Sequence, residues 1–165
     1  MRRFQQVDVF GGSPFRGNPV AVVLDADGMT DDEMRDFAVW TNLSETTFVL
    51  PPSTPAASYR VRIFSLSREL PFAGHPTLGT AHAWVASGGK PSADGRLVQE
   101  CKAGLIPVRV TDDGFAFAAP PTIRSGAVDP AGVAELVAQL RIDAKDVLAS
   151  QWVSNGPGWV ALQLT

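Results

Sequence analysis

The chain has 165 residues, of which 45% are hydrophobic and 19% are charged, and its formal net charge is −3. This composition favours a packed core over disorder, and the scattered basic residues argue against a nucleic-acid-binding surface. No apolar run approaches the roughly 18 residues of a membrane helix, and the N-terminus lacks the apolar stretch of a signal peptide. We therefore expect a soluble, cytoplasmic protein with no nucleic-acid or membrane partner.

The first part of the chain predicts strands separated by turns, with one helix among them. Thr30 and Glu33 have the spacing of a capping box, which indicates the start of a helix that runs to Trp40. The predicted strands are alternating or short apolar runs at residues 4–10, 20–24, 46–50 and 59–65.

A second helix is predicted over residues 75–86, with Pro76 at its first position, where a missing N–H costs nothing. Its small residues, Gly79, Thr80 and Ala83, suit a helix that is surrounded by a sheet. Three further strands, the last two joined by an Asp-Asp-Gly hairpin turn, are predicted at residues 96–101, 104–110 and 114–119.

The last part of the chain predicts a linker, a helix and a strand. Residues 120–128 resemble a linker, and Asp129 and Pro130 have the positions of an N-cap and a first helical residue. Residues 158–164 read as an unpaired strand, which would leave an exposed apolar edge and favour pairing with another segment.

Two segments share a layout that suggests a partial internal repeat. Residues 17–24 (GNPVAVVL) and 155–164 (NGPGWVALQL) each place Asn, Gly and Pro before an apolar strand. If this is a repeat, the chain ends one strand into its second copy.

Glu45 is the acidic residue of the segment NLSET, which joins the first helix to an apolar strand. A carboxylate at the edge of a core is partly desolvated, which favours proton uptake and suits general acid–base catalysis. An exposed loop position, or a role in accepting backbone N–H groups, is the commoner explanation of such a residue.

His75 stands between Gly74 and Pro76 at the start of the second helix. Helix capping or surface exposure is its usual role. The functional alternative is that the free N–H groups of Gly74 and His75 bind an anion such as a carboxylate, while the imidazole relays a proton. Asn18 is most simply a turn residue. His82 follows His75 at seven residues, but no acidic or Cys ligand joins them, so no metal site is predicted.

Four segments together carry a resemblance to a known family. VDVFGGSPFRGNPVAVVLDADGM, NLSETTFVLPP, YRVRIFS and RELPFAGHPTLGTAHAWV follow in order and closely resemble the N-terminal half of the PhzF-like isomerase family of phenazine biosynthesis. The resemblance covers about residues 7–120, and the tail NGPGWVALQL resembles the opening of the family's second half.

The resemblance implies an α+β fold of the diaminopimelate-epimerase-like type. One half of that fold is an antiparallel or mixed sheet wrapped around a central helix, which would be residues 75–86. We accordingly expect an epimerase-like domain over residues 1–125 and the start of a truncated second domain over residues 126–165.

The resemblance also implies an isomerase of biosynthetic, secondary metabolism that uses no cofactor and no metal. A Glu moves a proton between carbons of a small carboxylated substrate, and by motif this is Glu45. His75, from the GHP motif, would assist catalysis, whereas Gly74, Asn18 and Ser44 would contact the substrate.

Related epimerases use paired cysteines instead, and two residues argue against that chemistry here. Ala73 stands at the matching position of the FAGHP segment. Cys101, the single cysteine, lies in a predicted strand with no nearby His, which indicates a buried structural thiol. A thiol racemase is therefore the weaker hypothesis.

The family's site lies between two halves, and this sequence carries the first half and only the start of a second. Three interpretations follow. A complementary second-half chain completes the site, or the chain forms a homodimer, or it is a non-catalytic binding or interaction module or an inactive fragment of such an enzyme.

Overall fold

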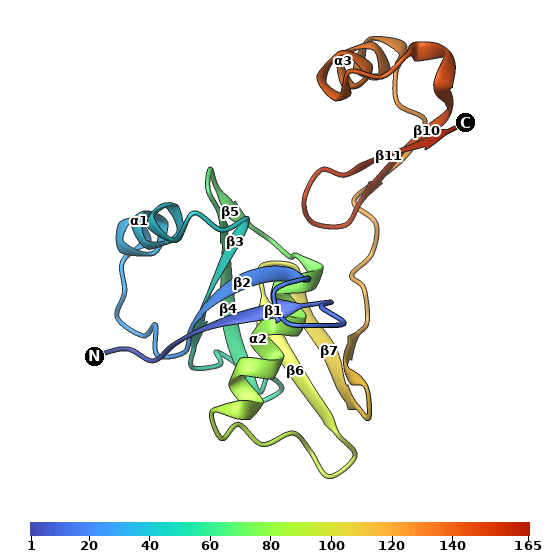
Figure 1. The fold of residues 1–165 in the computed structure, drawn as a ribbon. Coiled ribbons are helices and arrows are strands. Elements are labelled where there is room, and N and C mark those ends of the chain that lie inside the picture. Colours follow the sequence, from blue (N-terminus) through green and yellow to red (C-terminus); the bar gives the residue numbers. More distant parts are fainter. The chain divides into compact units, whose positions relative to one another are not determined.

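The computed structural model describes residues 1–165, which separate into two units, Met1–Ala119 and Pro120–Thr165. The first unit is built on an eight-stranded mixed sheet and two helices (Figure 1). No helix of the structure has both the length and the apolar character needed to cross a bilayer. In chain order the elements of the first unit are β1 (Phe4–Val9), β2 (Asn18–Val23), α1 (Asp31–Thr41), β3 (Glu45–Leu50), β4 (Tyr59–Ser65), β5 (Glu69–Leu70), α2 (Gly74–Ala86), β6 (Arg96–Cys101), β7 (Gly104–Thr111) and β8 (Gly114–Phe117).

The sheet has the strand order β1-β2-β3-β4-β6-β7-β8, with β5 paired to β4. Two neighbouring pairs, β2 with β3 and β4 with β6, are parallel, and the other pairs are antiparallel. The parallel pairs are the places where a helix intervenes between the strands, as parallel neighbours require. The expected α+β class with a mixed sheet is confirmed.

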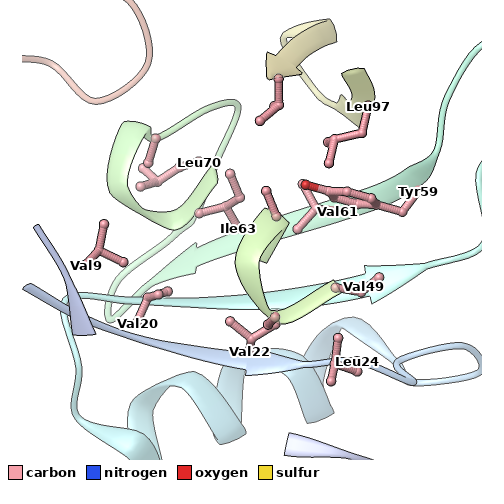
Figure 2. Close-up of a cluster of buried hydrophobic side chains, with 14 residues drawn as sticks. Val9, Val20, Val22, Leu24, Val49, Tyr59, Val61, Ile63, Leu70 and Leu97 are labelled. Carbon is pink, nitrogen blue, oxygen red and sulfur yellow. The ribbon is translucent and has the colours of Figure 1, made fainter. Parts of the chain in front are cut away.

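Helix α2 lies in the hollow of this curled sheet, in contact with both of its edge strands, β1 and β8. The hydrophobic cluster around it includes Val9 of β1, Val20 and Val22 of β2, Val49 of β3, Tyr59, Val61 and Ile63 of β4, and Leu97 of β6 (Figure 2). His82 lies against Phe115 of β8, with ring centroids 5.9 Å apart. The small side chains of α2 are buried as expected, since a helix enclosed on several sides has no room for large ones.

Gly79 of α2 packs directly against β1 and β2, and this close packing gives the first testable prediction. A Cβ added there would lie 2.3 Å from Val20 Cγ1 and 3.0 Å from Val9 Cγ2. Overpacking of this kind costs about 1–3 kcal/mol, and the better helix propensity of Ala offsets up to about 1. We expect Gly79→Ala to lower the free energy of unfolding in urea by about 1–2 kcal/mol. Gly12→Ala, with no atom within 4 Å of the new Cβ, is the control, and equal midpoints for the two variants would refute the prediction.

Helix α1 covers the opposite face of the sheet. Met34 and Ala38 pack with Phe48 and Phe64 in a second hydrophobic cluster. The predicted capping box is confirmed, because Thr30 accepts from the Glu33 N–H and Glu33 accepts from the Thr30 N–H.

The start of α2 differs from the sequence prediction. The helix begins at Gly74, and its N-cap is Ala73, whose backbone is extended. His75 is therefore not a capping residue, and Pro76 is the third helical residue rather than the first. Proline is tolerated there because the first four N–H groups of a helix have no intrahelical partner.

The second unit contains a three-stranded antiparallel sheet of order β11-β10-β9 and one α-helix. Two predictions for this region are wrong. Residues 120–128 are not simply a linker, since β9 lies within them, and the final strand is not unpaired, since β11 pairs with β10. Asp129 and Pro130 do begin the helix, as predicted. The elements are β9 (Arg124–Gly126), α3 (Pro130–Leu140), a 3-10 turn (Ala144–Asp146), β10 (Val147–Ser154) and β11 (Val160–Leu164).

Candidate active site

Glu45 is the first residue of β3, directly after the turn that ends α1. Asn42 ends that helix in the left-handed region, at φ 56°, and turns the chain toward the sheet. Side chains alternate along a strand, and Thr47 of β3 accepts a hydrogen bond from Thr80 of α2. Glu45 lies two residues before Thr47, so it faces the same side of the sheet as α2.

His75 is the second residue of α2 and meets Glu45 across the hollow of the sheet. Glu45 Oε2 and His75 Nε2 lie 3.4 Å apart, and the two side chains are 14% and 11% exposed. Neither atom has a hydrogen-bond partner, although both are buried. The contact is therefore close but not aligned as a hydrogen bond, and both atoms remain able to bond to a third group.

Asn18, the first residue of β2, contacts the other side of the His75 ring. Its Nδ2 lies 3.3 Å from His75 Nδ1. An amide nitrogen can only donate, so this contact is a hydrogen bond in the tautomer whose proton is on Nε2. In that tautomer the Nε2–H faces Glu45. Strand β2 runs beside β3, and α2 contacts both strands, which explains why residues 18, 45 and 75 meet although they are far apart in the sequence.

Burial dominates the electrostatics of His75 and lowers the pKa of its imidazole below the ordinary value. The charge of Glu45 and the Pro19 carbonyl, which can accept a hydrogen bond from the protonated ring, act in the opposite direction but do not cancel the effect of burial. Near pH 7 the ring is accordingly neutral, with one nitrogen able to donate and the other able to accept.

The pH dependence of His75 follows from these causes. We expect its NMR titration midpoint to lie below about 6.5 and to fall further in Glu45→Gln, because that substitution removes the charge that favours protonation. Since the folded pKa is below the unfolded one, the contribution of His75 to stability is present above about pH 6.5 and is lost as the pH falls. A midpoint that rises in Glu45→Gln would contradict this account.

Gly74 precedes His75 at the start of α2, where no side chain caps the helix. The N–H groups of both residues belong to the unpaired first turn, which favours anions such as carboxylates. A Cβ on Gly74 would lie 3.2 Å from Phe117 Cζ. Phe117 of β8, which also packs edge-on against Phe72, therefore borders this turn. Nothing in the sequence had marked Phe117 as a candidate site residue.

Two further residues considered from the sequence are Ser44 and Cys101. Ser44 is exposed beside Glu45 and is not among the residues that contact His75. Cys101 ends β6, half-buried rather than fully buried, with its sulfur 3.6 Å from the Gly104 carbonyl oxygen. Burial raises the pKa of this thiol, which keeps it protonated and poorly nucleophilic.

Comparison with known proteins gives consistent similarities. A family model described as phenazine biosynthesis-like protein (PhzC-PhzF) matches residues 7–165. Antisense-enhancing sequence 1 of Schizosaccharomyces pombe is 39% identical over 98% of this chain and 57% of its own length. Trans-2,3-dihydro-3-hydroxyanthranilate isomerase of Pseudomonas aeruginosa is 45% identical over 65% of this chain and 37% of its own length.

The solved structure of a predicted epimerase from Pseudomonas aeruginosa matches with a TM-score of 0.82 and 29% identity. The match covers 100% of this chain and 60% of that one. The chain thus spans little more than half the length of the relatives that it matches throughout. Because the family model matches nearly all of its residues, the chain belongs to the phenazine biosynthesis-like (PhzC-PhzF) family, and it has the diaminopimelate-epimerase-like fold that the sequence resemblance implied.

Proposed function

We propose that this chain forms the first half of an isomerase that moves a proton from one carbon to another in a small carboxylated substrate, using no cofactor and no metal. The observation that carries the proposal is the buried pair of Glu45 and His75, whose facing atoms have no hydrogen-bond partner. The isomerase named among its relatives supports the reaction class.

In the proposed reaction the Glu45 carboxylate takes a proton from a substrate carbon, and the electron pair of that C–H bond moves into the conjugated substrate. Glu45 then gives the proton to a second carbon and returns to its ionised form. Carbon acids are weak, so the base must be held close to the reacting atom and partly shielded from water. His75 orients the substrate or assists protonation, and Gly74, Asn18 and Ser44 bind it.

The N-terminus of α2 supports a carboxylated substrate. Negative charge grows on the substrate as the proton leaves, and backbone N–H groups at a helix start stabilise such charge. Gly74 and His75 supply these groups beside the Glu45 carboxylate.

We also propose that a second copy of the chain, or a complementary second-half chain, completes the site. The second unit supports this, because none of the residues of α3 is buried. Residues of helix α3 and of strands β10 and β11 line an open apolar cavity of about 620 Å³. Apolar surface of this kind usually packs against another segment.

The test combines native and denaturing mass spectrometry with an activity assay. Denaturing mass identifies the chains in the purified protein, and native mass counts them in each assembly. The probe is trans-2,3-dihydro-3-hydroxyanthranilate, the compound in the name of one relative. We expect an assembly of two chains that isomerises the probe or a related carboxylated ring. A lone 17.5 kDa monomer that neither binds nor isomerises such compounds would refute the proposal and favour an interaction module.

A further inference from the structure

Three consecutive hydrogen bonds run through the core beneath the first turn of α2. Tyr59 Oη donates to Gln99 Oε1 over 3.2 Å, and Gln99 Nε2 donates to Thr77 Oγ1 over 2.9 Å. Thr77 Oγ1 in turn donates to the Ala73 carbonyl over 2.9 Å. Gln99 and Thr77 are 0% exposed. Polar groups at this depth are costly unless every one of them is satisfied, so their arrangement is closely constrained.

The direction of each bond is fixed by the number of available hydrogens. Thr77 has one hydroxyl hydrogen, and the Ala73 carbonyl receives it, so Thr77 Oγ1 can only accept from Gln99. The amide nitrogen of Gln99 must therefore face Thr77, and its oxygen must face Tyr59. Burial raises the pKa of the Tyr59 hydroxyl, which keeps it a donor at neutral pH.

This series of bonds ends at the residue that leads into the candidate site. Ala73 is the N-cap of α2, and Gly74 and His75 follow it directly. The Ala73 carbonyl accepts the first helical hydrogen bond from the Thr77 N–H over 3.2 Å, and it accepts a second bond from the Thr77 hydroxyl.

We propose that Gln99 and Thr77 are positioning residues, which set the orientation of Gly74 and His75 toward Glu45 through the Ala73 carbonyl. The inference rests on the function proposed for Glu45 and His75. It assigns a role to two residues that do not themselves touch the substrate.

Helix α2 carries a second buried hydroxyl that provides a matched control. Thr80, also 0% exposed, donates to Thr47 Oγ1 over 2.8 Å. Thr77→Val and Thr80→Val thus remove the same group from the same helix with little change in volume. Only the first of them breaks the connection to Ala73.

The test is two-dimensional NMR of the full 165-residue chain, following the amides of Gly74 and His75 and the titration of the His75 ring. We expect Thr77→Val to move both amide resonances and to raise the His75 midpoint toward its ordinary value, because a less firmly held ring is less buried. Thr77→Ser retains the hydroxyl and should restore the wild-type values. Thr80→Val should leave them unchanged.

Gln99→Met removes the hydrogen bonds to Tyr59 and Thr77 while keeping a side chain of similar volume. This variant replaces Thr77→Val in the test if Thr77→Val does not fold. It should shift the same resonances in the same direction. Unchanged amides and midpoint in either folded variant would overturn the inference. Equal shifts in Thr80→Val would also overturn it, because they would indicate a general loosening of α2. These readouts need no turnover, so they are separate from any failure of the proposed isomerase activity.

Discussion

Glu45→Gln should slow isomerisation severely while leaving substrate binding largely intact. A glutamine side chain has nearly the same shape as glutamate but cannot accept a proton from carbon at neutral pH. Loss of a general base typically lowers the rate by about 10²–10⁴-fold, and we expect kcat to fall within that range. The measurement is product formation from the probe compound, with binding followed by calorimetry on the same samples.

The control for this substitution is Glu100→Gln. Glu100 is a partly buried glutamate on β6 that accepts hydrogen bonds from Ser53, away from the His75 pair. It should keep wild-type turnover. If Glu45→Gln turns over as fast as Glu100→Gln, Glu45 is not the proton carrier and the assignment of the site is wrong.

His75→Gln should lower turnover by roughly 10–100-fold, which is less than the loss of the base itself. Glutamine retains a donor at the end of its side chain but cannot titrate and cannot bridge Asn18 and Glu45 as a flat ring does. Because His75 orients the substrate or assists protonation, we expect the effect to fall mainly on kcat.

The pH profile separates the two roles of His75. If the imidazole titrates in catalysis, the acidic limb of the wild-type kcat/KM profile should contain an ionisation below about pH 6.5 that is absent from the profile of His75→Gln. A variant with wild-type kcat and an unchanged profile would show that His75 has neither role. His82→Gln is the matched control, since His82 lies on the same helix against Phe115.

Local signals in the sequence predicted most elements of the first unit. The capping box of Thr30 and Glu33 fixes the start of α1, and strict alternation marks β4. Both signals depend on contacts between near neighbours in the chain, which is why sequence reasoning finds them. The short strand β5 was missed, because a strand of two residues has no periodicity.

The errors in the second unit have a physical cause. Strand β9 is the exposed tripeptide Arg124-Ser125-Gly126, and its last residue has φ 98°. Nothing in such a tripeptide indicates a strand until β10 pairs with it. The pairing of β11 was missed because its partner strand β10 had not been predicted.

The residues of the candidate site could be predicted from the sequence only in part. Physical reasoning about Glu45 and His75 separately left structural roles open, and only the family motif joined them. Their 3.4 Å approach depends on how the sheet curls around α2. The sequence does contain an indication of the role of Gln99, because this polar residue lies on the inward face of β6, on the same side as buried Leu97. Its hydrogen-bond partners lie on β4 and α2, which the sequence alone does not bring together.

The most direct test of the central claim is the rate at which the protein introduces solvent deuterium into carbon positions of the probe compound in D₂O. Mass spectrometry of recovered probe and product gives this rate for wild type, Glu45→Gln and Glu100→Gln. The account predicts uptake by the wild type and by Glu100→Gln, because the proton on the Glu45 carboxyl exchanges with D₂O in part of the turnovers before it reaches the second carbon. The rate should be lower by at least about 10²-fold in Glu45→Gln. Uptake by Glu45→Gln at the wild-type rate would contradict it.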